Sequence, residues 1–182
     1  MKISGTPIEG LLIIEPARFG DERGWFSETW NAQRFAAAGI ECEWVQDNHS
    51  MSSAVGTLRG LHYQKPPNAQ AKLVRCTRGK IWDVAVDYRP QSPTYLKYFG
   101  IELEPQSGTQ LFIPSGFLHG FVTLEPDSEI QYKCDAFYAP EADAAIRWND
   151  PDIGIDWPLD ANPILSAKDE AAPFTSDTAS PF

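Results

Sequence analysis

Histidines, cysteines and basic residues are scarce in this sequence, and each shortage argues against a class of protein. The 182 residues include three histidines and three cysteines, and 15 basic residues stand against 25 acidic ones. The net charge of -10 argues against nucleic acid as a partner, because binding to a phosphate backbone requires a basic surface. Cys42, Cys76 and Cys134 are odd in number and lack CxxC spacing, so they fit buried thiols in a reducing cytoplasm.

Long hydrophobic runs are also missing. No apolar segment approaches the roughly 20 residues that span a bilayer, and the opening MKISGTPIEG lacks the apolar region of a signal peptide. We therefore expect a cytoplasmic protein that does not enter a membrane. With 42% hydrophobic and 22% charged residues, the chain has the composition of a globular protein. Its length suits one domain over residues 1–182.

Short runs rich in Val, Ile, Phe, Tyr and Trp lie between glycines and prolines along most of the chain, and they predict strands. These runs are LLIIEP, GWFSETW, WVQDNHSMS, TLRGLHYQ, AKLVRCT, KIWDVAVDY, YFGIELE, QLFIP, LHGFVTL and EIQYKCDAFY. Only NAQRFAAAG predicts a helix, with Gly39 as its C-cap. The pattern favours an all-β fold, a jelly-roll sandwich or barrel with minor helices. Residues 170–182 are polar and interrupted by proline, which predicts a loosely attached tail.

The segment PSGFLHGF has the PxGxxH spacing of the second motif of cupin-type jelly rolls. In metal-binding cupins an earlier strand supplies an HxH pair and a glutamate, but the corresponding strand here reads RGLHYQ. His62 and His119 alone make a poor site for zinc or iron, which usually take at least three protein ligands. We therefore expect a cupin-like barrel without a metal, suited to acid–base chemistry. A metal-dependent cupin dioxygenase is an alternative.

Several side chains suit acid–base chemistry. Histidine, with an unperturbed pKa of about 6.5, can accept a proton near neutral pH, which makes His62 a candidate base. Lys72 is a candidate to stabilise an oxyanion, and Tyr132 or Tyr138 to deliver a proton. The candidates to orient the histidine ring are Asp83, Asp87 and Asp169. A sugar-binding jelly roll without catalytic activity is a further alternative.

The geometry of RGLHYQ raises a difficulty for a single site. Residues two apart on a regular strand face the same way, so His62 and Gln64 share one face while Arg59 points to the other. If Arg59 and His62 serve one site, the strand must bulge or twist at Gly60, a common use of a strand glycine. Eight of the 15 basic residues lie between residues 59 and 97, which favours a local positive pocket for a small anion.

Five long segments resemble the dTDP-4-dehydrorhamnose 3,5-epimerase family. They are DERGWFSETW, VQDNHSMSSAVGTLRGLHYQ, AKLVRCTRGKIWDVAVDYRPQSPTY, IPSGFLHGF and AIRWNDPDIGIDWP. The resemblance runs in order from about Gly5 to Asp169. It implies a cofactor-free homodimer that inverts C3 and C5 of dTDP-4-dehydro-6-deoxy-D-glucose, a dTDP-linked 4-keto-6-deoxy sugar. An epimerase that inverts only C3 or only C5 of a related nucleotide-linked 4-ketosugar is the alternative.

The resemblance also implies roles for individual residues. His62 matches the base, and Asp169 matches the aspartate that orients it. Lys72 matches the lysine beside the keto oxygen, where its charge stabilises an enolate, and Tyr132 matches the acid that reprotonates the carbon from the opposite face. The matching substrate-binding positions are Phe19, Arg23, Glu28, Gln46, Asp47, Asn48, Arg59, Lys72, His119, Tyr138 and Lys168.

Some of these positions carry further expectations. Phe19 and Tyr138 resemble aromatic residues that flank the thymine base. Residues 23–28 match a region that serves the partner subunit's site, so we expect them to act across the dimer. One position departs from the family pattern, because Asp143 stands where the family often has a glutamate after YAPE. Asp143 is a shorter carboxylate, and Glu141 is the alternative contact.

Overall fold

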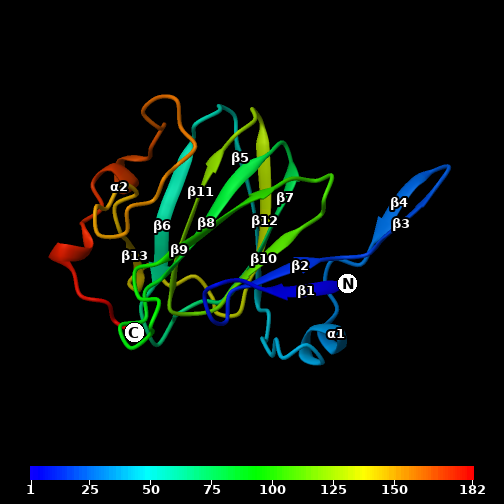
Figure 1. The fold of residues 1–182 in the computed structure, drawn as a ribbon, viewed down its shortest axis with the longest axis horizontal. Helices are drawn as coiled ribbons and strands as arrows, with labels where there is room; N and C mark the ends of the chain where they lie inside the picture. The colour runs from blue at the N-terminus through cyan, green and yellow to red at the C-terminus, as the bar shows by residue number, and fades with distance from the viewer.

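The computed structural model describes residues 1–182 as two antiparallel sheets that face each other, with a hairpin projecting from one end (Figure 1). The first sheet contains, in order, β1 (Lys2–Gly5), β2 (Leu12–Glu15), β10 (Gln110–Ile113), β7 (Lys72–Arg78), β12 (Ser128–Cys134) and β5 (Gln46–Ser52). The second contains β13 (Asp143–Ala145), β6 (Leu58–Gln64), β11 (Phe117–Thr123), β8 (Ile81–Asp87) and β9 (Tyr98–Leu103). The predicted all-β jelly-roll fold is confirmed.

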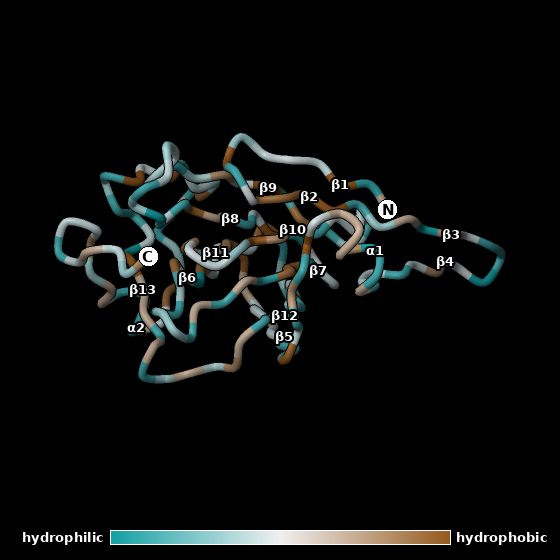
Figure 2. The backbone as a smooth tube through the Cα atoms, turned by 90° about the horizontal axis from the view of Figure 1, so that it is seen from below, coloured by the Kyte–Doolittle hydropathy of each residue, from teal (hydrophilic) through white to brown (hydrophobic).

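The hairpin consists of β3 (Arg18–Asp21) and β4 (Gly24–Ser27), which pair only with each other. We call residues 18–27 the arm. Figure 1 shows that the arm extends away from both sheets, and Figure 2 shows a hydrophilic tip. In the same view the hydrophobic stretches concentrate in the strands of the body.

Each run that the sequence predicts as a strand contains a strand in the structure, but the last predicted run continues beyond the end of its strand. β12 ends at Cys134, and residues 135–138 form a loop instead. β1, β3 and β13 are strands that the sequence does not predict. They are three or four residues long, and partner strands stabilise them more than their own composition does.

The main core lies between the two sheets. Ile81 and Ala85 on one face of β8 pack with residues of the first sheet such as Val74. The opposite face of β8, including Val84, is also buried, under a later segment of the chain that contributes Trp157. Because both faces of β8 are covered, its sequence alternates only in part between apolar and polar residues.

The predicted helix is present but shorter than its sequence pattern. α1 (Ala32–Ala36) begins after Asn31, whose side chain accepts a hydrogen bond from the Arg34 amide. It ends before Gly39, which takes a left-handed conformation with φ of 82°. Phe35 of α1 packs on the outer face of the first sheet.

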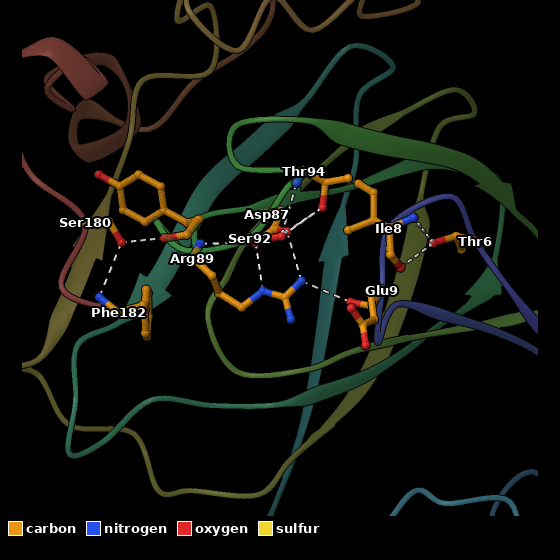
Figure 3. Close-up of polar contacts among 10 residues, drawn as sticks. Thr6, Ile8, Glu9, Asp87, Arg89, Ser92, Thr94, Ser180 and Phe182 are labelled. Carbon is orange, nitrogen blue, oxygen red and sulfur yellow. Dashed lines mark hydrogen bonds and ion pairs between the residues drawn. The ribbon is translucent and has the colours of Figure 1, made fainter.

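A hydrogen-bonded cluster closes the turn that follows β8 (Figure 3). The Asp87 carboxylate accepts hydrogen bonds from Arg89 Nε at 2.8 Å, Ser92 Oγ at 2.5 Å and Thr94 Oγ1 at 2.7 Å. Arg89 also donates to the Glu9 carbonyl at 3.0 Å, so the cluster ties the N-terminal segment to the second sheet.

The chain after β13 covers the outer face of the second sheet and carries the short helices α2 (Ala167–Glu170) and η1 (Thr175–Asp177). Its last residues contact the body: Tyr88 Oη donates to the Thr178 carbonyl at 3.2 Å, and the Phe182 and Tyr88 ring centroids are 6.4 Å apart. The segment expected to be a loose tail therefore packs against the sheet in the structure. None of the helices has the length and hydrophobicity needed to cross a membrane.

Candidate active site

A pocket of about 430 Å³ lies between the two sheets and is lined by residues from both. Most of the residues predicted from the sequence line this one pocket. The predicted residues that line it are His62, Lys72, Tyr132, Gln46, Asn48, Arg59, His119, Tyr138, Asp143 and Lys168. Residues that the sequence spreads over more than 120 positions thus share one cavity because β5, β6, β7, β11 and β12 all border it.

The structure selects one of the three aspartates that the sequence leaves as candidates to orient His62. His62 Nε2 lies 2.5 Å from Asp169 Oδ1. Asp83 instead lies 2.8 Å from Nε2 of His119, which is also nearly buried. Asp87 belongs to the cluster after β8 and does not reach the pocket. Asp169 is therefore the aspartate that holds the ring of His62.

The surroundings of Asp169 favour its ionised form. Burial alone would raise the pKa of this carboxyl group, but the hydrogen bonds from His62 and Ser166 outweigh burial and lower it. Ser166 caps α2 by accepting the Asp169 amide, and its hydroxyl donates to Asp169 Oδ2 at 2.8 Å. The helix start thus fixes a carboxylate that can orient the ring of His62.

Lys72 and Tyr132 face the pocket from neighbouring strands of the first sheet. The Lys72 Nζ atom is 6.0 Å from the centroid of the Tyr132 ring. Burial lowers the pKa of Lys72, although the nearby Cys134, Asp83 and Asp143 act in the opposite direction. Burial raises the pKa of Tyr132, which keeps its hydroxyl protonated. A protonated phenol can deliver a proton, and a lysine can supply positive charge to an oxyanion.

The backbone at Gly60 explains how Arg59 and His62, which strict alternation would place on opposite faces of β6, can serve one pocket. Gly60 has a φ of 123°, and the pairing of β6 with β11 shifts register opposite it, between His119 and Phe121. This irregularity changes the alternation, and both Arg59 and His62 line the pocket. A β-carbon at Gly60 would lie 2.6 Å from the backbone of β11, so no larger residue fits there. The predicted distortion is confirmed.

Asp143 rather than Glu141 lies at the pocket. Its Oδ2 atom accepts a hydrogen bond from Tyr138 Oη at 3.1 Å and another from Lys168 Nζ. Glu141 is exposed and does not line the cavity. The shorter carboxylate therefore connects a surface aromatic ring with the lysine beside Asp169.

Besides Asp169, which contacts His62 from outside the pocket lining, four predicted residues lie outside the pocket of their own chain. Phe19 and Arg23 belong to the arm, where Arg23 pairs with Asp21, and Glu28 pairs with Arg34 at 3.1 Å. The fourth, Asp47, points to the opposite face of the first sheet. There it pairs with Lys133 at 2.9 Å.

The pocket also contains residues that the sequence-based prediction misses. They are Ser50, Gln64, Gln70, Phe121 and Ile130. Strand alternation carries a signal for four of them, since Ser50, Gln64, Phe121 and Ile130 each lie two positions from a predicted residue on the same strand. Gln70 precedes β7 in a loop, where no periodicity exists. No group of three or more His, Cys, Asp or Glu side chains is positioned to hold a metal ion.

The two-sheet fold and this pocket define a jelly-roll protein equipped for acid–base chemistry on a small ligand. Comparison with known proteins identifies the family within that class. A sequence profile of the family described as dTDP-4-dehydrorhamnose 3,5-epimerase matches residues 5–177. The curated dTDP-4-dehydrorhamnose 3,5-epimerase of Salmonella typhimurium is 50% identical over 96% of this chain and 95% of its own.

Solved structures agree with the sequence comparison. The crystal structure of dTDP-4-dehydrorhamnose 3,5-epimerase from Elizabethkingia anophelis matches with a TM-score of 0.93 and 47% identity, covering 98% of both chains. An epimerase from Legionella pneumophila, solved in complex with dTDP-4-keto-L-rhamnose, matches with a TM-score of 0.92 and 44% identity over 96% of this chain and 93% of its own. The chain belongs to the dTDP-4-dehydrorhamnose 3,5-epimerase family, and the predicted family and enzyme class are confirmed.

Proposed function

We propose that the protein inverts C3 and C5 of dTDP-4-dehydro-6-deoxy-D-glucose by proton exchange, giving dTDP-4-dehydro-L-rhamnose for dTDP-rhamnose synthesis. The observation that carries this proposal is that His62, 2.5 Å from Asp169, lines a pocket that also contains Lys72 and Tyr132. The bound keto sugar of the Legionella pneumophila relative supports the substrate class.

The first step removes a proton from a carbon next to the ketone. His62, oriented by Asp169, accepts this proton, and the electron pair of the broken C–H bond moves onto the ketone oxygen. The resulting enolate carries negative charge on that oxygen. Lys72 supplies a fixed positive charge, which stabilises the enolate more than the neutral ketone and therefore lowers the barrier.

The second step returns a proton from the other face of the sugar. Tyr132 reaches the pocket from β12 of the first sheet, whereas His62 reaches it from β6 of the second. Reprotonation by Tyr132 opposite the base inverts the carbon. His62 then holds one extra proton and Tyr132 lacks one, and exchange with water restores both before the second carbon reacts. The ketone is already present in the substrate, so this scheme needs no nicotinamide and no metal.

Substrate binding uses the charged and aromatic groups around the reacting centre. Arg59 is held by Ser52 Oγ at 3.1 Å, and with Lys168 it supplies positive charge to the diphosphate. Asn48 offers an amide to the sugar hydroxyls. The Tyr138 ring is exposed and suits stacking with thymine.

The arm supports a homodimer with shared sites. Phe19, Trp25 and Phe26 are 63%, 61% and 66% exposed on a hairpin that projects from the body (Figure 1). Large exposed apolar side chains on one element favour burial against a partner. Because Arg23 and Glu28 do not line the pocket of their own chain, a second copy is the place where they can contact substrate.

The cysteines support a cytoplasmic location. All three are free, and burial raises the pKa of Cys134 to about 11. Protonated, buried thiols fit a reducing compartment and take no part in the proposed reaction.

Proton exchange in heavy water tests the function directly. The wild-type protein, mixed with the 4-keto sugar in heavy water, should incorporate deuterium at both C3 and C5, as measured by NMR. His62→Ala should abolish exchange at both carbons, whereas Tyr132→Phe should reduce net inversion more than the first exchange. His49→Ala is the matched control, because His49 pairs with Glu129 away from the pocket.

Each other outcome favours a different function. Deuterium at one carbon only indicates a C3-only or C5-only epimerase. Binding of the sugar nucleotide without exchange indicates a sugar-binding jelly roll. Normal exchange in His62→Ala would eliminate His62 as the base.

A further inference from the structure

The loop after β12 carries two exposed aromatic rings, and one of them, Tyr138, lines the pocket. We call residues 136–139 the aromatic loop, in which Phe137 and Tyr138 are 69% and 56% exposed. The loop lies beyond the end of β12, where the ladder pairing with β5 and β7 stops at Cys134. Its backbone therefore needs hydrogen-bond partners from elsewhere in the protein.

Glutamine side chains supply these partners. Gln70 Nε2 donates to the Ala136 carbonyl at 2.8 Å, and Gln64 Nε2 donates to the Phe137 carbonyl at 3.1 Å. Gln46 Oε1 accepts the Tyr138 amide at 2.9 Å, and Gln64 Oε1 accepts the Ala139 amide at 2.8 Å. Each of the four successive loop residues thus has a hydrogen bond to a glutamine.

Gln64 is unsuited to contact a ligand directly, although its side chain lines the pocket. The residue is 4% exposed. One amide N–H binds the Asn68 carbonyl at 2.7 Å, and the other binds the Phe137 carbonyl. Both of its donors are therefore occupied by backbone, and its oxygen already accepts the Ala139 amide. Its influence on a ligand must pass through the loops that it holds.

We propose that Gln64 and Gln70 are positioning residues that keep the aromatic loop in the conformation that receives the base of the nucleotide. This inference rests on the proposed function, because it assumes that a nucleotide occupies the pocket. A loop that is ordered before binding loses less conformational freedom when the base stacks on it, and affinity rises accordingly. The rings then remain exposed without collapsing onto the sheet.

The aromatic loop is separate from the reacting centre, which makes the expected effect selective. The loop meets the rest of the site through the hydrogen bond from Tyr138 to Asp143 and through Gln46, which also donates to Asn48. Neither Gln64 nor Gln70 bonds to His62, Lys72 or Tyr132. Loosening the loop should therefore weaken nucleotide binding and leave the chemical step nearly unchanged.

Gln64→Met tests this inference, because methionine keeps the length of the side chain and removes its hydrogen bonds. We expect the Kd for dTDP, measured by calorimetry, and the KM for the sugar nucleotide each to rise about tenfold, because two hydrogen bonds to the loop are lost. The kcat should stay within about twofold. Gln70→Met removes one bond and should raise Kd by a smaller factor.

Gln110→Met is the matched control. Gln110 is a glutamine with 2% exposure that also donates to a backbone carbonyl, that of Thr29 at 2.7 Å, but it does not line the pocket. It should lose stability without losing affinity for dTDP. If Gln64→Met and Gln70→Met keep the wild-type Kd and KM, or lower kcat alone, the inference is overturned. Failure of the proposed function would show in the wild type, as absent dTDP binding or absent deuterium exchange.

Discussion

Lys72 is the residue whose ionisation limits the proposed reaction at high pH. Burial lowers its pKa below the ordinary value of a lysine, while burial raises the pKa of Tyr132 above that of a tyrosine. When Lys72 loses its proton as the pH rises, the enolate loses its counter-charge. We expect kcat to fall on the alkaline side at a pH below the ordinary lysine pKa.

Lys72→Arg tests this assignment, because a guanidinium stays charged far above the pKa of a lysine. The variant should be slower than the wild type, since the guanidinium has a different shape, but its alkaline decline should move to higher pH. Lys133→Arg, on the opposite face of the first sheet, should keep the wild-type profile. An unchanged alkaline decline in Lys72→Arg would assign that decline to another group.

At the residue scale, the family resemblance predicts most of the residues that line the pocket. Asp47 is an exception, because the resemblance makes it a substrate-binding residue, whereas in the structure it lies on the face of β5 opposite to that of Gln46 and Asn48. The roles of Gln64 and Gln70 are not predictable in this way. They depend on a loop that lies more than 60 positions further along the chain, and no local pattern connects the two.

At the scale of elements, the errors arise where tertiary contacts override local preference. Phe137 and Tyr138 favour strands, yet the Asp135 carboxylate accepts the Ala71 amide at 2.6 Å, beside the point where the ladder ends. β13 is the converse case, since the residues of Asp143–Ala145 have little strand preference and pair with β6. The buried faces of longer strands such as β8 are predictable because alternation is a local property.

The hydrogen-bonded cluster around Asp87, in the turn that follows β8, should stabilise the fold in a pH-dependent way (Figure 3). Burial alone would raise the pKa of Asp87, but hydrogen bonds from Arg89, Ser92 and Thr94 outweigh it and lower the pKa to about 2. The folded value lies below the unfolded value of about 3.9. The cluster therefore contributes stability above about pH 4, of about 2 kcal/mol, which is lost as the pH falls towards 2.

Asp87→Asn should remove this contribution. At neutral pH the free energy of unfolding in denaturant should fall by about 2 kcal/mol, and the difference from the wild type should shrink near pH 2. Asp160→Asn, at an exposed aspartate, is the control and should match the wild type at both pH values. Equal losses for Asp87→Asn at both pH values would contradict the ionic origin of the effect. Protein concentration must be held constant, because any association of folded chains would also stabilise them.

At the scale of the whole molecule, the proposed homodimer predicts that each site needs residues from two chains. His62 lies in the pocket of its own chain, whereas Arg23 lies on the arm, outside that pocket. In a dimer with exchanged arms, each site would combine the pocket of one chain with the arm of the other. Two variants that are each inactive for a different reason should then restore one site when they share a dimer.

Mixing the subunits of His62→Ala and Arg23→Ala tests this arrangement. In a mixed dimer, the pocket of the Arg23→Ala chain keeps His62 and receives an intact arm from the His62→Ala chain. Random pairing makes half of the dimers mixed, so activity should recover to about a quarter of the wild type. His62→Ala mixed with Tyr132→Phe is the control, because both groups belong to the pocket of one chain and no complete site can form. If the first pair recovers no more activity than this control, the arm serves its own chain.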